Sequence, residues 1–81
     1  MKAVLWSQHH CPFCDQTRGM LRQKGIEVEE RKIGDGYTEE ELLEAVPGAR
    51  TVPQIFIDDV HVGGFPELRN YLSGLGLKNV N

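Results

Sequence analysis

The sequence predicts a small α/β protein with a mixed four-stranded sheet and helices on both faces. Strand and helix patterns alternate in the order β-α-β-α-β-β-α along the 81 residues. The first two strands are joined through a helix, which requires a right-handed crossover between parallel strands. The last two strands are joined by a tight turn at Asp58-Asp59, which makes them antiparallel.

Composition restricts the class of protein and its partners. A chain of 81 residues has room for one domain, which we expect to span residues 1–81. The formal charge of −3 disfavours nucleic acid as a partner. No apolar run approaches the roughly 20 residues that span a bilayer, and the N-terminal stretch is too short for a secretory signal. We therefore expect a cytoplasmic monomer without a membrane partner.

The first half of the chain reads as strand, helix and strand. The apolar run Ala3–Trp6 predicts a buried strand, and Ser7–His10 predicts a polar loop. A helix follows with Pro12 at its first position, where the missing N–H costs nothing, and it stops at Gly25. Ile26–Lys32 begins with alternation and becomes fully charged, which suits an edge strand.

A capping box predicts the start of a second helix, because Thr38 is followed three residues later by Glu41. Its apolar residues are Leu42, Leu43 and Val46. Pro47-Gly48 ends it.

The last third of the chain predicts a hairpin followed by a helix. Gln54–Ile57 and Val60–Val62 are its two strands. Gly63-Gly64 then leads into a helix with Pro66 near its start. The apolar face of this helix carries Leu68, Tyr71, Leu72 and Leu75.

The chemistry is concentrated in Cys11-Pro12-Phe13-Cys14, which holds the only two cysteines. Two thiols on the first turn of a helix can close a small disulfide reversibly. Free N–H groups and the positive end of the helix dipole stabilise a thiolate at the helix start, which lowers a cysteine pKa. We expect Cys11 to attack an external disulfide and the less accessible Cys14 to resolve the mixed disulfide.

Other interpretations of the two cysteines have less support from the sequence. A ring this small constrains the unfolded chain little, which argues against a purely structural disulfide. Zinc bound by His9, His10, Cys11 and Cys14 is disfavoured, because structural zinc sites pair two separated ligand clusters. An iron–sulfur cluster shared between two chains stays open.

Three motifs together resemble a dithiol glutaredoxin, and the compact bacteriophage members in particular. They are Cys11-Pro12-Phe13-Cys14, the run Thr51–Ile57 and His61-Val62-Gly63-Gly64. The resemblance implies a thioredoxin-like fold with sheet order 2-1-3-4 and a cis Val52–Pro53 bond. It implies an enzyme that uses glutathione as reducing co-substrate and holds no metal and no tightly bound cofactor.

The same resemblance implies where glutathione binds. The backbone of Val52 would pair with the peptide as an extra strand, and the first amides of the last helix would receive its γ-glutamyl carboxylate. The implied substrate-binding residues are Gln8, Phe13, Arg50, Thr51, Val52, Pro53, Gly63, Gly64, Phe65 and Glu67.

Some of these positions depart from the family pattern. Glutaredoxins usually have a lysine where this chain has Gln8, so Arg50 would have to supply the charge for the glycyl carboxylate. Phe65 and Pro66 replace a small residue and an aspartate, and Pro66 removes an N–H donor. Glu67 is one position later and would meet the glutathione ammonium. These changes predict weaker glutathione binding.

The leading hypothesis is a cytosolic oxidoreductase that reduces protein disulfides or glutathione mixed disulfides. Its alternative within the enzymes is a thioredoxin-like electron donor, for example to ribonucleotide reductase, recharged by a flavin reductase. An iron–sulfur or metal-binding module and an interaction domain with an incidental disulfide belong to other classes.

Overall fold

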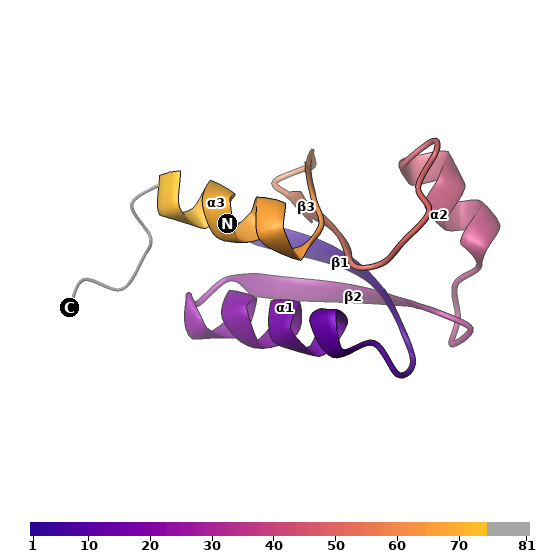
Figure 1. Ribbon diagram of the computed structural model, residues 1–81, viewed down its shortest axis with the longest axis horizontal. Helices are drawn as coiled ribbons and strands as arrows, with labels where there is room; N and C mark the ends of the chain where they lie inside the picture. Colours follow the sequence, from indigo (N-terminus) through magenta and orange to yellow (C-terminus); the bar gives the residue numbers. More distant parts are fainter. Residues whose placement is uncertain (75–81) are drawn as a thin grey trace.

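The computed structural model describes residues 1–74, and its elements follow the predicted order (Figure 1). The elements are β1 (Lys2–Gln8), α1 (Pro12–Gln23), β2 (Glu27–Ile33), α2 (Glu39–Ala45), β3 (Gln54–Ile57), β4 (Val60–Gly63) and α3 (Phe65–Gly74). The capping box predicted for α2 is confirmed, because Thr38 Oγ1 accepts from Glu41 N–H and the Glu41 carboxylate accepts from Thr38 N–H. None of the helices in residues 1–74 is long and apolar enough to cross a membrane.

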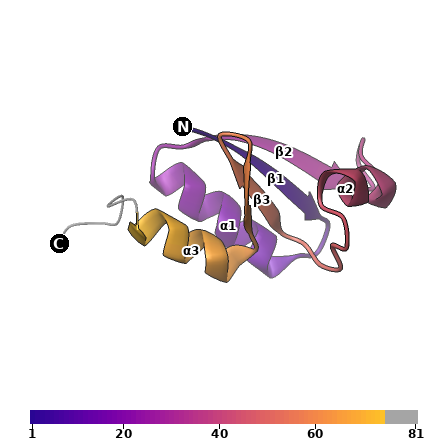
Figure 2. The ribbon, with the colours of Figure 1, turned by 90° about the horizontal axis from the view of Figure 1, so that it is seen from above.

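The four strands form one sheet in the order β2-β1-β3-β4, as predicted (Figure 2). β1 is parallel to β2 and antiparallel to β3, and β3 is antiparallel to β4. Asp58 and Asp59 both have positive φ, 48° and 70°, so the two-residue turn has the mirror-image conformation that suits the twist of a hairpin. A register shift between Ile55 and Phe56 leaves β4 irregular next to Gly63.

The main core lies between the sheet and the helix pair α1 and α3, which run side by side in both views. Alternate residues of β1 and β3 point into it because successive side chains of a strand alternate between faces. The buried cluster consists of Ala3, Leu5, Leu21, Ile26, Ile55, Ile57, Leu68 and Leu72. The predicted core position Leu75 lies outside the described residues.

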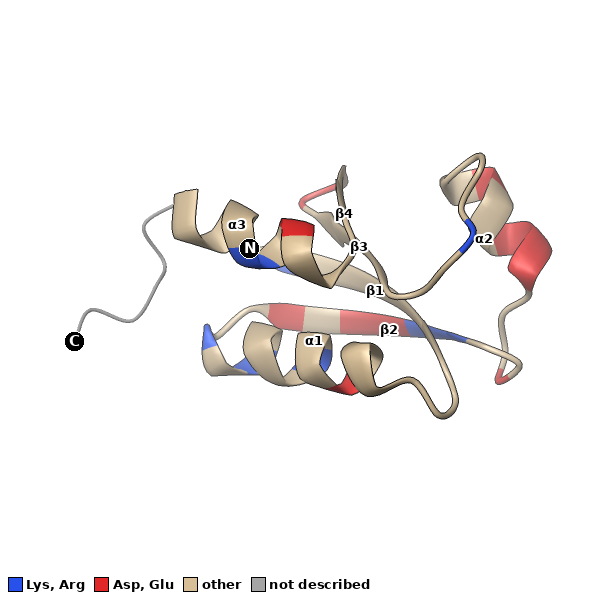
Figure 3. Ribbon diagram, viewed as in Figure 1, with Lys and Arg blue, Asp and Glu red and all other residues tan. Residues whose placement is uncertain are grey.

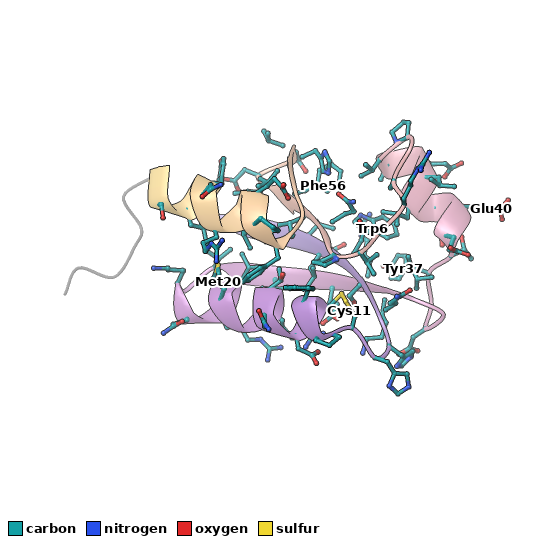
Figure 4. The ribbon with its side chains drawn as sticks, in the orientation of Figure 1. Trp6, Cys11, Met20, Tyr37, Glu40 and Phe56 are labelled. Atoms are coloured by element: carbon teal, nitrogen blue, oxygen red, sulfur yellow. A yellow bond between two sulfur atoms is a disulfide. The ribbon has the colours of Figure 1, made fainter. Side chains whose placement is uncertain are left out.

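The other face of the sheet is covered less. Trp6 is buried there, packs edge-on against Tyr37 with ring centroids 5.7 Å apart, and carries the Arg31 guanidinium 5.3 Å from its ring centre. α2 stands apart from α1 and α3, near Trp6 and Tyr37 (Figure 4), and its Ala45 shares a small cavity with Trp6. Helices therefore cover both faces of the sheet as predicted, with α1 and α3 on one face and, within residues 1–74, only α2 on the other.

The end of β1 differs from the prediction. Ser7 and Gln8 were expected in a loop, which is wrong, because both continue β1 and pair with Lys32 and Ile33 of β2. A parallel partner of equal length satisfies their backbone groups, and the buried Ser7 hydroxyl donates to the Glu30 carboxylate at 2.6 Å. Polar composition alone therefore ended the predicted strand two residues too early.

An ion pair fastens α1 to the edge strand β2. Arg18 reaches Glu30 with two parallel hydrogen bonds of 2.7 and 2.6 Å, and it also bonds Asp15 at 2.9 Å. The bonds from Arg18 hold the pKa of Glu30 at about 2, with a smaller contribution from Ser7, although partial burial opposes this effect. The same contacts raise the pKa of Arg18. The charges along β2 are visible in Figure 3.

Replacing Glu30 by Gln should lower the free energy of unfolding at pH 7 by about 2 kcal/mol, because a charged bidentate contact is lost. Since the folded pKa of Glu30 lies below its usual 4.5, its contribution is present above that pH and is lost as the pH falls toward 2. The difference in free energy of unfolding between wild type and variant should therefore become smaller as the pH falls from 4.5 toward 2, which denaturant titrations measure. The exposed Glu27 of the same strand supplies the control variant Glu27→Gln. A gap that stayed constant with pH would contradict the assignment.

Candidate active site

The two cysteines occupy the first turn of α1 and form a disulfide, with their Cα atoms 5.2 Å apart. Cys11 is the N-cap residue, Pro12 follows at the first helical position, and the Cys14 N–H donates to Cys11 Sγ at 3.2 Å. An N–H directed at this sulfur stabilises negative charge on it once the bond is reduced. The bond is drawn in yellow at the start of α1 in Figure 4.

The surroundings of the two sulfurs differ. Cys11 is partly exposed, whereas Cys14 is completely buried beside the core. An external reagent can therefore reach Cys11 first, and Cys14 is placed to react only with its neighbour. The roles expected of the two thiols from the sequence stay a prediction, which this difference in exposure supports.

Opposite Cys11 lies the turn that carries the Val52–Pro53 peptide, which is cis. The prediction of a cis bond is thus confirmed. The Val52 carbonyl oxygen lies 3.9 Å from Cys11 Sγ, and Pro53 is buried. The backbone of Val52 therefore borders the space that a sulfur bound to Cys11 would occupy.

A groove of about 490 Å³ extends from Phe13, which lies between the two cysteines in the sequence, past the Thr51–Gln54 segment to the start of α3. Phe13 of α1 and Phe65 of α3 pack against each other along this groove, with ring centroids 5.8 Å apart. Phe13 is 56% exposed although it is apolar, so it offers contact area to a ligand. The lining residues are Phe13, Thr51, Val52, Pro53, Gln54, Gly63, Gly64, Phe65, Pro66 and Glu67.

At the far end of this groove the Gly64 N–H donates to Glu67 Oε1 at 2.8 Å. A Cβ at Gly63 would lie 2.9 Å from the Cβ and Cγ of Glu67, and Gly63 has a φ of 126°. Only glycine suits Gly63, for both reasons. The Glu67 side chain thus lies across the glycine pair, with its carboxylate at the start of α3.

The structure does not bring Gln8 and Arg50 into this groove. Both line a separate cavity of about 100 Å³, which shares Thr51 and Val52 with the groove. The Thr51–Val52 segment therefore stands between two recesses, and any contact from Gln8 or Arg50 to a ligand must come from its other side. The remaining predicted binding residues all line the groove.

Sequence reasoning missed Gln54 as a lining residue. Its amide Nε2 donates to the Thr51 carbonyl at 3.1 Å, and its Oε1 lies 2.8 Å from His61 Nε2. These contacts brace the Thr51–Pro53 turn against β4. The sequence feature that could have identified Gln54 is its position directly after Pro53, at the first residue of β3. Pro66 was noted for its missing N–H, but it also lines the groove.

Within the described residues 1–74, no three histidine, cysteine or carboxylate side chains lie together as metal ligands would. His9 and His10 precede the disulfide, and His10 has a φ of 57°, which turns the chain from β1 toward α1. The two histidines are therefore loop residues, as expected.

Comparison with known proteins agrees with this geometry. Residues 3–62 match the family model described as Glutaredoxin. A Synechocystis protein described as a probable glutaredoxin is 38% identical over 68 residues, which are 83% of this chain and 77% of that one. Glutaredoxin 1 of Francisella tularensis, solved with cacodylate, superposes with a TM-score of 0.77 at 30% identity over 95% of this chain and 98% of that one. A buckwheat glutaredoxin solved with glutathione shares the fold, with a TM-score of 0.78 at 24% identity over 93% and 71%.

Alkylation of the reduced protein should distinguish the two thiols. Iodoacetamide at neutral pH should modify Cys11 at least about tenfold faster than Cys14, because Cys11 is accessible and its thiolate is stabilised. Peptide mapping by mass spectrometry after short exposures measures both rates. The Cys14→Ser variant should keep the fast reaction and Cys11→Ser should lose it. Equal rates at the two positions would contradict the assigned roles.

Proposed function

The chain belongs to the glutaredoxin family and is a thiol–disulfide oxidoreductase, and we propose that its reductant is glutathione. Its substrates would then be protein disulfides or glutathione mixed disulfides. The observation that carries the proposal is the partly exposed Cys11, which accepts from the Cys14 N–H and lies 3.9 Å from the Val52 carbonyl oxygen, beside a groove that Phe13 and Val52 line.

The first step of the proposed reaction is attack by the Cys11 thiolate on a mixed disulfide between a protein and glutathione. A bond forms between Cys11 Sγ and the glutathione sulfur, and the protein sulfur leaves as a thiolate that takes up a proton. The hydrogen bond from the Cys14 N–H stabilises the Cys11 thiolate before it attacks. The groove beside Cys11 would hold the glutathione part.

Two routes complete the cycle. A second glutathione thiolate can attack the glutathione sulfur bound to Cys11, which releases glutathione disulfide and returns the Cys11 thiolate. With a protein disulfide, Cys11 first forms a bond to one protein sulfur, and the other leaves as a thiolate that takes up a proton. Cys14 then attacks Cys11 Sγ, the bound protein sulfur leaves as a thiol, and the Cys11–Cys14 disulfide remains. Two glutathione molecules then reduce this disulfide and are oxidised to glutathione disulfide.

In this proposal the Val52 N–H and C=O pair with the bound peptide as a short strand, beside Thr51 and Pro53. Phe13 and Phe65 pack against its apolar parts. Gln8 and Arg50 would reach the glycyl carboxylate from the second recess. We propose the cytoplasm as the compartment, because glutathione is kept reduced there.

One observation favours a second candidate, the thioredoxin-like donor recharged by a flavin reductase. The Gly64 amide is already bonded to Glu67, and Pro66 has no amide hydrogen, so the start of α3 offers fewer donors to a γ-glutamyl carboxylate. Reduced affinity for glutathione would make another reductant competitive.

The two candidates separate in coupled assays. The protein should turn over a glutathionylated peptide with glutathione, glutathione reductase and NADPH, and at least about tenfold more slowly with thioredoxin reductase and NADPH, because a glutathione groove selects its own reductant. The reverse order would support the second candidate. Elemental analysis and the visible spectrum of the same preparation test the alternative of a bound metal or cluster.

Variants of the cysteines test the assigned steps. Cys11→Ser should lose turnover of the glutathionylated peptide by about a thousandfold or more, because the attacking sulfur is gone. Cys14→Ser should lose reduction of a protein disulfide but keep turnover of the mixed disulfide. Ser73→Ala, an exposed change on α3, is a control that should leave both reactions intact. Full activity of Cys11→Ser would refute the mechanism.

A substitution of Gln8 tests whether the cavity lined by Gln8 and Arg50 binds the glycyl carboxylate of glutathione. Gln8→Lys places a cation beside Arg50 and should lower KM for glutathione mixed disulfides by about three- to tenfold, with kcat little changed, because it adds binding to a distant carboxylate. Steady-state kinetics at low ionic strength measure this. A lowered kcat with unchanged KM would contradict the placement of the glycyl carboxylate.

A further inference from the structure

We infer that Glu67 sets the charge preference of the groove, so that disulfides with a cationic or neutral group beside the reacting cysteine are favoured over those with a carboxylate there. The inference rests on the proposed function, because it concerns the substrate that occupies the same groove. It identifies the substrate class as protein segments whose cysteine is flanked by basic or neutral residues.

The position of the Glu67 carboxylate is built into the chain. Its stem packs on Gly63, where an added Cβ would lie 2.9 Å from Glu67 Cβ and Cγ, and its Oε1 accepts from the Gly64 N–H at 2.8 Å. The Gly64 position also lies close to the Pro53 carbonyl, since a Cβ there would be 3.5 Å from that oxygen. The carboxylate therefore sits at the α3 end of the groove, where the glycine pair adjoins the Pro53 carbonyl.

This carboxylate occupies the place where a helix would otherwise attract an anion. The first-turn amides of α3 have no intrahelical acceptor and carry the positive end of the dipole. Glu67 takes one of these donors and Pro66 contributes none. An incoming carboxylate must therefore displace Glu67 or lie beside a like charge.

No ion pair among residues 1–74 includes Glu67. The guanidinium of Arg69, two residues further along α3, lies over the Phe65 ring, 5.7 Å from its centre. The negative charge at the end of the groove is therefore available to a substrate cation.

The test uses substrates in which charge alone varies. Three symmetrical disulfides are made from acetylated, amidated tripeptides whose central cysteine is flanked on both sides by lysine, glutamine or glutamate. Each oxidises the reduced protein: its disulfide becomes two thiols as Cys11 and Cys14 form theirs. Glutathione itself is less informative, because its γ-glutamyl end carries both an ammonium and a carboxylate.

Stopped-flow rate constants at low ionic strength should favour the lysine peptide over the glutamate peptide in the wild type. Glu67→Gln keeps an acceptor for Gly64 but removes the charge, so the lysine-to-glutamate ratio should fall about three- to tenfold. Glu67→Ala, which also frees the Gly64 amide, should lower this ratio at least as far. Urea titrations of both variants verify the fold.

Glu41→Gln is the matched control, because Glu41 caps the start of α2 in the same way and the variant changes the net charge equally. It should alter the ratio less than about twofold, since distant exposed charges are screened. A ratio unaffected by both Glu67 variants, or changed equally by Glu41→Gln, would overturn the inference. If the wild-type protein reacts with none of the peptides, the proposed thiol–disulfide exchange itself fails, which is a different result.

Discussion

The start of α1 has to be held next to the Thr51–Pro53 turn, and the rest of the site depends on this constraint. The two-pronged contact of Arg18 with Glu30 fixes the helix to β2, and Ser7 ties the same carboxylate to β1. Three elements are therefore clamped together one helical turn beyond the disulfide. A shift of α1 would move Cys11 away from Val52 and widen the groove at its reactive end.

The clamp also explains how two cysteines three positions apart acquire different chemistry. Cys11 is the N-cap residue and has extended backbone angles, whereas Cys14 lies inside α1 and is buried. Because the sheet face is fixed beneath α1, Cys14 is buried, while Cys11 is partly exposed and lies 3.9 Å from the Val52 carbonyl oxygen. The hydrogen bond between them then stabilises charge on the accessible sulfur. Accessibility and thiolate stabilisation thus arise from one local geometry.

Much of the fold was predictable because local signals agreed with it. Thr38 with Glu41, Pro12 at a helix start and Asp58-Asp59 at a hairpin each act within a few residues, and each appears as expected. The strand order and the cis Val52–Pro53 bond came from the family resemblance, since no local pattern specifies them. The separation of Gln8 and Arg50 from the groove and the bond from Gly64 to Glu67 were beyond reach, because they depend on how distant or flexible side chains settle in three dimensions.

The charged sequence of β2 has a consequence for the behaviour of the protein at high concentration. An outer strand exposes unpaired backbone groups on which another chain can add a strand. Here three acidic side chains and then two basic ones follow along that edge strand, and the opposite edge, β4, is short and irregular next to Gly63. Each edge of the sheet is thus a poor template for growth into an aggregate.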